Sequence, residues 1–185
     1  MRALVLLADG FEEVEAITSI DFLRRAGVET VAVGVTGRDV VGGHDISVSS
    51  DVTIDEVREG SGDGYDALVV PGGARGAENI AADERAMDLV RGAIRDGKLV
   101  AAICAAPGLV LGAHDLLGAH RFTCYPGFES HATSGSFVED RVVVDGNLIT
   151  SRGPGTAAEF AEAVVTRLVG SDAASELHRR TLQKS

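Results

Sequence analysis

A cysteine at the end of an apolar run is the first residue in this chain that could do chemistry. Residues 99–103 are continuously apolar, and Cys104 is followed by two alanines and Pro107. This order predicts a buried strand, a sharp turn that carries Cys104, and then a helix. Unpaired N–H groups and the positive dipole end of a helix favour the thiolate, so we expect a nucleophilic thiolate at Cys104. The alternative, a small buried hydrophobic residue, stays open at this point.

A carboxyl group is the second candidate. Glu15 lies in the first turns of a predicted helix over 12–26 that otherwise presents apolar residues to the core. A partly buried carboxyl has a raised pKa. When protonated, Glu15 could donate a hydrogen bond to the Cys104 sulfur, and when ionised it could accept a proton from an adduct. The alternative, an acid that is favourable near a helix N-terminus, explains Glu12 and Glu13 better than Glu15.

Alternating strands and helices must position these groups. Apolar runs predict buried strands at 2–8, 30–35, 67–70 and 99–103 and a short strand at 122–124. They also predict a hairpin or an edge excursion within 40–52 and a hairpin within 142–150. Helical spacing predicts helices at 12–26, 83–96, 106–113 and 157–169, with a short polar helix or frayed tail at 172–183. This pattern indicates an α/β fold with a mostly parallel sheet, in one domain over 1–185.

The carboxyl ends of parallel strands meet at one edge of a sheet, where ligands bind. Three segments converge there: the loop that leads to Glu15, the loop with Gly72 and Gly73, and the Cys104 turn. A thiolate adding to an aldehyde would create a negative oxygen, and the backbone amides of Gly73 and Ala105 are candidates to bind it. The alternative for the two glycines is a simple turn after a strand.

Composition excludes several classes of function. The net charge of −11 and the absence of Trp argue against a nucleic-acid partner, and no apolar run is long enough to span a membrane. The five histidines lack metal-ligand spacing, and no nucleotide-binding motif follows the first strand, so we expect neither a metal nor a cofactor. Two cysteines and the lack of a recognisable signal peptide lead us to expect a cytoplasmic protein.

Four motifs, taken together and in order, resemble the DJ-1/PfpI (ThiJ) superfamily, and within it the DJ-1/ThiJ clade. They are Ala8-Asp-Gly-Phe-Glu-Glu-Val-Glu15, Val70-Pro-Gly-Gly73, Ala101-Ala-Ile-Cys-Ala-Ala-Pro107 and Thr150-Ser-Arg-Gly-Pro-Gly-Thr156. The resemblance implies a flavodoxin-like (class I glutamine amidotransferase-like) three-layer sandwich and a homodimer. It also implies that Cys104 is the reactive cysteine, that Glu15 is its hydrogen-bonded partner, and that the amides of Gly73 and Ala105 form the oxyanion site.

The chain departs from the family pattern at two positions. Ala105 stands where related proteases carry histidine after the nucleophile, which argues against a cysteine–histidine triad. Tyr125 aligns with a histidine of the clade, and its hydroxyl can form a hydrogen bond but is a poor base near neutral pH. Cys124 is a second thiol that could resolve an oxidised Cys104, or a passive strand residue. The segment 151–156 could bind an anion or cap the following helix.

The leading hypothesis is therefore an enzyme that detoxifies or repairs reactive dicarbonyls, of the glutathione-independent glyoxalase or protein deglycase type implied by the resemblance. Cys104 and Glu15 would be catalytic, with Gly72, Gly73, Ala105 and Tyr125 around the substrate, which would be a small dicarbonyl or a glycated amine or thiol. The alternative is a redox-sensing stress chaperone that uses oxidation of Cys104. Amidase or peptidase action lacks a histidine for the thiol.

Overall fold

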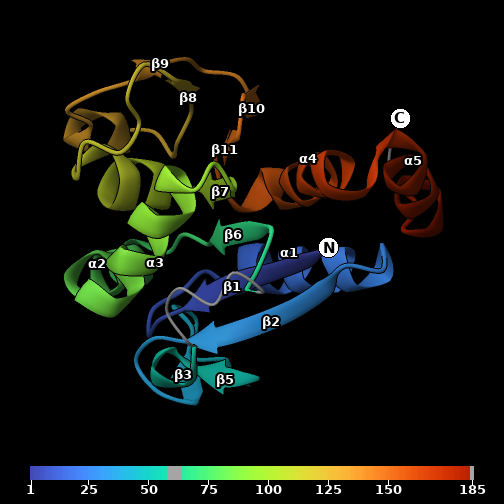
Figure 1. The fold of residues 1–185 in the computed structure, drawn as a ribbon, viewed down its shortest axis with the longest axis horizontal. Helices are drawn as coiled ribbons and strands as arrows, with labels where there is room; N and C mark the ends of the chain where they lie inside the picture. The colour runs from blue at the N-terminus through green and yellow to red at the C-terminus, as the bar shows by residue number, and fades with distance from the viewer. Residues whose placement is uncertain (58–63, 184–185) are drawn as a thin grey trace.

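A central sheet organises the fold (Figure 1). The computed structural model describes residues 1–57 and 64–183, and within them seven strands form one sheet in the order β10-β11-β7-β6-β1-β2-β5. Neighbouring strands are parallel except β10, which pairs antiparallel with β11. The strands are β1 (Arg2–Leu7), β2 (Glu29–Gly34), β5 (Val52–Thr53), β6 (Ala67–Val70), β7 (Leu99–Ile103), β10 (Val142–Asp145) and β11 (Leu148–Ser151).

The middle strands form because their sequences are apolar without interruption. Every residue of β6 and β7 is buried, as is every residue of β1 after Arg2. Strands with two buried faces need helices on both sides of the sheet. The core strands predicted from the apolar runs are confirmed, with bounds that agree to within one residue.

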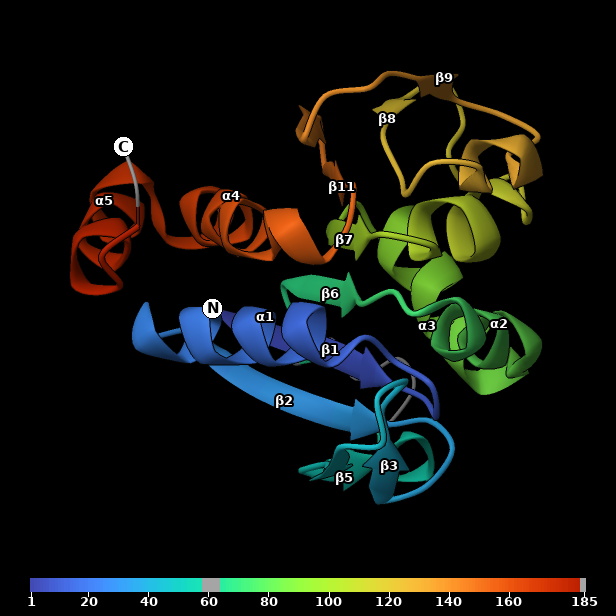
Figure 2. The same ribbon diagram turned by 180° about the vertical axis from the view of Figure 1, so that it is seen from behind.

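Helices cover the two faces of the sheet. On one face α1 (Glu13–Arg25) packs along α4 (Ala157–Val169), and α5 (Ser171–Arg180) packs on α4 at the end of the molecule where the C-terminus lies (Figure 2). On the other face α3 (Glu84–Arg95) contacts β6 and β7, and α2 (Ala74–Ala82) packs beside it. The three-layer, flavodoxin-like arrangement predicted from the sequence is confirmed.

Smaller elements surround the carboxyl edge of the sheet. They are the hairpin β3 (Asp39–Val41) and β4 (Ser47–Ser49), the parallel pair β8 (Arg121–Phe122) and β9 (Ser136–Phe137), the 3-10 helices η1 (Ile54–Glu56), η3 (Phe128–His131) and η4 (Pro154–Thr156), and the π-helix η2 (Pro107–Gly112). The hairpin predicted within 142–150 is therefore confirmed, and of the two alternatives within 40–52 the hairpin is confirmed. The helix predicted at 106–113 is a π-helix of six residues.

The helix α2 was not predicted from the sequence. It follows the double glycine directly and contains Gly76, a residue that weakens helices. A side chain at Gly76 would place its Cβ 2.7 Å from the Cα of Phe11, so this glycine lets α2 lie against the loop that follows β1. Tertiary packing therefore outweighs the low helix propensity of the segment.

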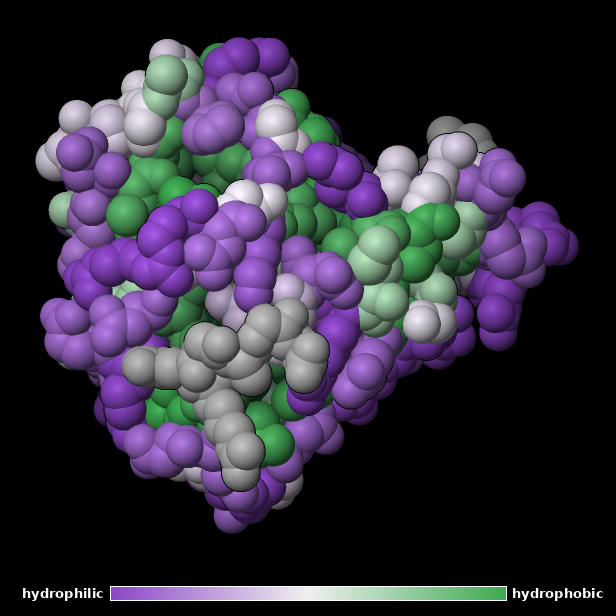
Figure 3. Space-filling model, viewed as in Figure 1, coloured by the Kyte–Doolittle hydropathy of each residue, from purple (hydrophilic) through white to green (hydrophobic). Residues whose placement is uncertain are grey.

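The surface is mostly hydrophilic on the face drawn in Figure 3; on its α4–α5 side hydrophobic residues lie over α4, and the outer end formed by α5 is hydrophilic. In the described part of the chain, no helix combines the length and the apolar character that a membrane span requires.

Candidate active site

Cys104 occupies a strained turn directly after β7. Its φ of 65° lies in the left-handed region, which costs a non-glycine residue free energy and persists only where the surroundings fix it. Two backbone hydrogen bonds fix it here: the Cys104 amide donates to the Ser151 carbonyl (2.9 Å), and the Cys104 carbonyl accepts from the Tyr125 amide (2.8 Å). The residue is 9% exposed. The thiol is thus held at the sheet edge with a small opening to solvent.

Glu15 projects from α1 toward the same point and is fully buried. Its Oε2 accepts a hydrogen bond from the Gly72 amide at 2.8 Å. Its Oε1 is buried without a hydrogen-bond partner in the part of the chain that the structure describes. A Cβ at Gly72 would lie 2.4 Å from the Cβ of Cys104 and 2.7 Å from Oε2 of Glu15. The bare backbone at position 72 therefore allows the carboxyl and the thiol to come together.

The two groups shift each other's protonation. Burial raises the pKa of Glu15 to about 7, although the hydrogen bond from Gly72 lowers it. Burial and the negative charge of Glu15 raise the pKa of Cys104 to about 12, against the opposing effect of the Gly73 and Ala105 amides. Burial therefore acts against the thiolate that the position of Cys104 predicts, and the π-helix that follows is only six residues long.

Two backbone amides surround the sulfur. The backbone N–H groups of Gly73 and Ala105 lie close enough to the sulfur to act against the rise in the pKa of Cys104. Gly73 precedes α2 with a φ of 82°, a conformation that glycine adopts without strain. A Cβ at Gly73 would lie 2.3 Å from the Gly10 carbonyl oxygen, so the loop after β1 packs tightly on this residue. Amides held this rigidly can bind negative charge that develops next to the sulfur.

Gly153 lies beside the sulfur, and the Tyr125 ring packs next to Gly153. Tyr125 is 46% exposed, and its ring meets that of Phe128 edge to face, with the centroids 6.2 Å apart. A Cβ at Gly153 would lie 3.1 Å from Cδ2 of Tyr125 and 3.9 Å from Sγ of Cys104. Gly153 belongs to the motif at 150–156, but nothing in the sequence indicates that it lies at the sulfur. Only the tertiary placement of the loop after β11 reveals it.

The segment 151–156 satisfies its own polar groups. The hydroxyl of Thr156 lies 2.6 Å from that of Ser151, accepts from the Gly153 amide (3.1 Å) and donates to the Gly153 carbonyl (2.8 Å). These bonds favour the structural interpretation of the segment over an anion site, and they fix the backbone of Gly153.

The second cysteine lies apart from this chemistry. Cys124 is a free thiol, is fully buried and faces Oε2 of Glu129 at 3.9 Å. Burial and the charge of Glu129 raise its pKa to about 12. Cys124 is 0% exposed, whereas Cys104 is 9% exposed, and this complete burial favours the passive role.

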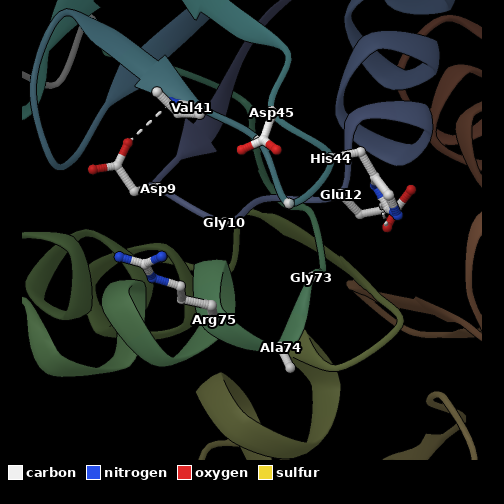
Figure 4. Close-up of a pocket in the computed structure, with 11 residues that line it drawn as sticks. Asp9, Gly10, Glu12, Val41, His44, Asp45, Gly73, Ala74 and Arg75 are labelled. Carbon is white, nitrogen blue, oxygen red and sulfur yellow. Dashed lines mark hydrogen bonds and ion pairs between the residues drawn. The ribbon is translucent and has the colours of Figure 1, made fainter.

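A polar cavity of about 540 Å³ opens beside the Gly73 loop (Figure 4). Glu12 and His44 lie together on one side of it, and Asp9 and Arg75 line the other. Glu12, Glu13 and His44 are a group that could offer ligand atoms to a metal, within 4.8 Å of one another. However, Nδ1 of His44 lies 2.9 Å from Glu13, and the His44 amide donates to the same carboxylate at 2.7 Å. The group thus fastens the β3–β4 hairpin to α1.

Comparison with known proteins identifies the family to which this chain belongs. The model of the DJ-1/PfpI family matches residues 1–167. The chain belongs to the DJ-1/PfpI family. Protein DJ-1beta of Drosophila melanogaster is 39% identical over 183 residues, which span 97% of this chain and 96% of that protein. Protein DJ-1 homolog B of Arabidopsis thaliana is 41% identical over 98% of this chain, but the matched region is 41% of that longer protein.

Solved structures of the family have the same fold. A DJ-1 superfamily protein of Salmonella typhimurium, solved as a cysteine-to-alanine variant, superimposes with a TM-score of 0.94 at 36% identity, covering 100% of this chain and 99% of that one. Toxoplasma gondii DJ-1, solved in an oxidized form, gives a TM-score of 0.94 at 34% identity with the same coverage. A family member of Pyrococcus abyssi that is named a deglycase is 37% identical over 84% of this chain and 92% of its own length.

Proposed function

We propose that this protein is a cysteine-dependent enzyme that converts reactive dicarbonyl compounds, or their early adducts with amines and thiols, into harmless hydroxy acids. The observation that carries the proposal is the buried Glu15 carboxyl, whose pKa is raised by burial to about 7, next to the thiol of Cys104. A base with this pKa is suited to move protons at neutral pH. The deglycase name of the Pyrococcus abyssi relative supports the same chemistry.

The first step forms a bond between sulfur and the aldehyde carbon. Glu15 accepts the Cys104 proton as the sulfur attacks, and its buried Oε1 is free to receive it. The amides of Gly73 and Ala105 bind the oxygen that becomes negative, which then takes the proton back from Glu15. A thiol with a raised pKa suits this order, because Glu15 generates the thiolate only as the new bond forms.

The second step transfers hydrogen within the adduct. Glu15, ionised again, removes the proton on the former aldehyde carbon and delivers it to the oxygen of the neighbouring ketone. Loss of the hydroxyl proton from the first carbon and protonation of the second carbon then give a thioester. One carbon is oxidised and the other reduced, so no external oxidant or reductant is needed. Water cleaves the thioester, which releases the hydroxy acid and restores the thiol of Cys104.

Lactate formation from methylglyoxal tests the proposal. We expect the Cys104→Ser variant to lose the activity and Glu15→Gln to lower kcat/KM by about 10²-fold or more, since it removes the general base. The wild-type kcat/KM should rise with pH through about 7, where Glu15 ionises. Labelling by iodoacetamide at alkaline pH serves as the control, because Glu15→Gln removes the charge that raises the pKa of Cys104 and should leave its thiol at least as reactive as in the wild type. Equal lactate formation by all three proteins would refute the catalytic assignment.

A redox-sensing chaperone is the second candidate. The two amides and the carboxyl around Cys104 could also hold an oxidised sulfur, and the oxidized form of Toxoplasma gondii DJ-1 supports this interpretation. The raised pKa of Cys104 weighs against it, because the thiolate is the form that peroxide oxidises. Mass spectrometry after mild peroxide treatment measures oxidation of Cys104, and an assay of client aggregation is run in parallel. If oxidation of Cys104 leaves client aggregation unchanged, the chaperone candidate is refuted.

The family resemblance and the surface together support a homodimer. Val14 and Ile17 of α1 are 51% and 43% exposed, and Ile46 in the neighbouring hairpin is 56% exposed. Val14 and Ile17 share one face of α1, and the contact between Glu13 and His44 joins this helix to the hairpin that carries Ile46, so we assign this region to the interface. Burial of that region against a second copy would remove apolar surface from water.

A further inference from the structure

The end of β11 lies directly against the Cys104 turn. Ser151 is the last residue of this strand and pairs in register with Ile103, the last residue of β7. The Ser151 carbonyl then accepts the Cys104 amide at 2.9 Å, so the parallel ladder continues one residue past the end of β7. The position of Ser151 therefore sets the point at which the strained turn begins.

Two buried hydroxyl groups hold Ser151 in this position. Ser151 is 0% exposed and Thr156 is 5% exposed, and their hydroxyl oxygens lie 2.6 Å apart. The Ser151 hydroxyl also donates to the Arg141 carbonyl at 2.8 Å, and the Thr156 hydroxyl accepts from the Gly153 amide at 3.1 Å. Removal of one hydroxyl would leave buried polar groups without partners, and a network of this kind then rearranges.

The loop that Thr156 closes also reaches the sulfur. The Thr156 amide donates to the Gly153 carbonyl at 2.8 Å, and a Cβ at Gly153 would lie 3.9 Å from Sγ of Cys104. Thr156 is thus connected to Cys104 at two points, through the Ser151 carbonyl and through the backbone of Gly153. The φ of 65° at Cys104 persists only where its surroundings fix it, so the turn should relax once these restraints are lost.

We propose that Thr156 is a positioning residue for the thiol of Cys104. Through Ser151 and Gly153, its hydroxyl keeps the turn in the left-handed conformation and holds the sulfur next to Glu15. This assigns to the segment 151–156 a role in the state of the thiol, beyond the hydrogen bonds that the segment makes within itself. The expected effect on turnover rests on the proposed function, whereas the expected effect on the thiol does not.

Thr156→Val tests the proposal, because it removes the hydroxyl and keeps the branched shape of the side chain. Burial and the charge of Glu15 raise the pKa of Cys104, so a turn that relaxes toward solvent carries a thiol that ionises more readily. Iodoacetamide should therefore label Cys104 about tenfold faster than in the wild type at pH 8, since one pKa unit changes the thiolate fraction about tenfold. Lactate formation should fall about tenfold or more, because the sulfur is displaced from the carboxyl. Thr156→Ser keeps the hydroxyl and should restore both rates.

The second cysteine distinguishes displacement of the turn from general unfolding. Cys124 is 0% exposed and reacts only when the fold opens. Mass spectrometry of the labelled peptides should show faster reaction at Cys104 while Cys124 stays unlabelled, and equal acceleration at both cysteines would overturn the inference. Thr166→Val is the matched control: Thr166 is exposed on α4, and its hydroxyl donates to the Glu162 carbonyl at 2.9 Å. This variant should label and turn over like the wild type.

Ser151→Ala provides an independent test where Thr156→Val does not fold, as judged by far-UV circular dichroism. It removes the other hydroxyl of the pair but keeps the backbone carbonyl that accepts from Cys104, and it should shift labelling and turnover in the same directions. Unchanged labelling of Cys104 in the folded variants would overturn the inference. Failure of the proposed function gives a different result: labelling would shift as expected although the wild type makes no lactate, and Thr156 would then position a thiol with another role.

Discussion

The buried Glu15 carboxyl should make the protein less stable as the pH rises, and replacing it with glutamine should remove that dependence. Burial raises the pKa of Glu15 in the folded chain to about 7 from its ordinary value of 4.5. Between these two values the folded state holds a proton that the unfolded state has already released. The free energy of unfolding therefore falls as the pH rises from about 4.5, and the loss is complete above about 7.

The size of the effect follows from the two pKa values. Their difference corresponds to about 3 kcal/mol of stability that is present at acid pH and lost at alkaline pH, and most of that loss falls between pH 5 and pH 8. In Glu15→Gln the amide oxygen can still accept from the Gly72 N–H, but no charge is buried. The variant should lose about 2 to 3 kcal/mol less stability than the wild type over the same interval.

Urea unfolding at pH 5 and pH 8 measures this difference. The chain has no Trp, so far-UV circular dichroism is the suitable signal. Protein concentration must be constant, because the stability of a dimer depends on it. Other titrating groups affect wild type and variant equally and cancel in the comparison. Glu78→Gln, on the exposed surface of α2, is the matched control for loss of one charge.

Equal losses in wild type and Glu15→Gln would refute the reasoning. That result would mean that Glu15 ionises with the same pKa in the folded and unfolded states, and burial would not be the source of a base at neutral pH. The same urea comparison in a Cys104→Ser background tests whether the thiol contributes to the pH dependence. The pKa of Cys104 is raised to about 12, so the thiol should not titrate between pH 5 and pH 8 and the difference should persist.

Two further predictions concern the packing of the site and the assembly of the chain. Gly72→Ala should abolish lactate formation and lower stability by about 1–3 kcal/mol, because its Cβ would lie 2.4 Å from the Cβ of Cys104 and 2.7 Å from Oε2 of Glu15; thermal unfolding and thiol labelling measure the two effects. Ile17→Glu should convert a dimer to a monomer in light scattering after size-exclusion chromatography, whereas an unchanged mass would place the interface elsewhere.

The sequence predicts the arrangement of the sheet because its core strands are short, apolar and separated by helical segments. Burial on both faces leaves a strand no polar positions, and this pattern is readable without a structure. The approach of Cys104 to Glu15 follows from the same reasoning, since each comes shortly after a core strand, at the carboxyl edge of a parallel sheet. The order of the elements therefore determines which residues meet.

The electrostatic state of the site was harder to predict. The sequence gives the position of Cys104 before a helical segment, and from this the thiolate was expected. It does not give the length of that helix or the degree of burial, and burial dominates the pKa of both Cys104 and Glu15. The Glu13–His44 contact was missed for a similar reason, since it depends on how the β3–β4 hairpin lies on α1. Side-chain desolvation and hairpin placement are properties of the packed fold.

The features that suit this site to catalysis are the features that cost the fold stability. A carboxyl with an ordinary pKa would be fully ionised at neutral pH and a weak base, so the burial that destabilises the chain by about 3 kcal/mol is also what allows Glu15 to accept and return a proton. The left-handed backbone of Cys104 is a second such cost. Both are located at the edge of a sheet whose central strands are fully buried, and that core offsets them. A substitution that relieves either cost should therefore stabilise the protein and weaken its chemistry.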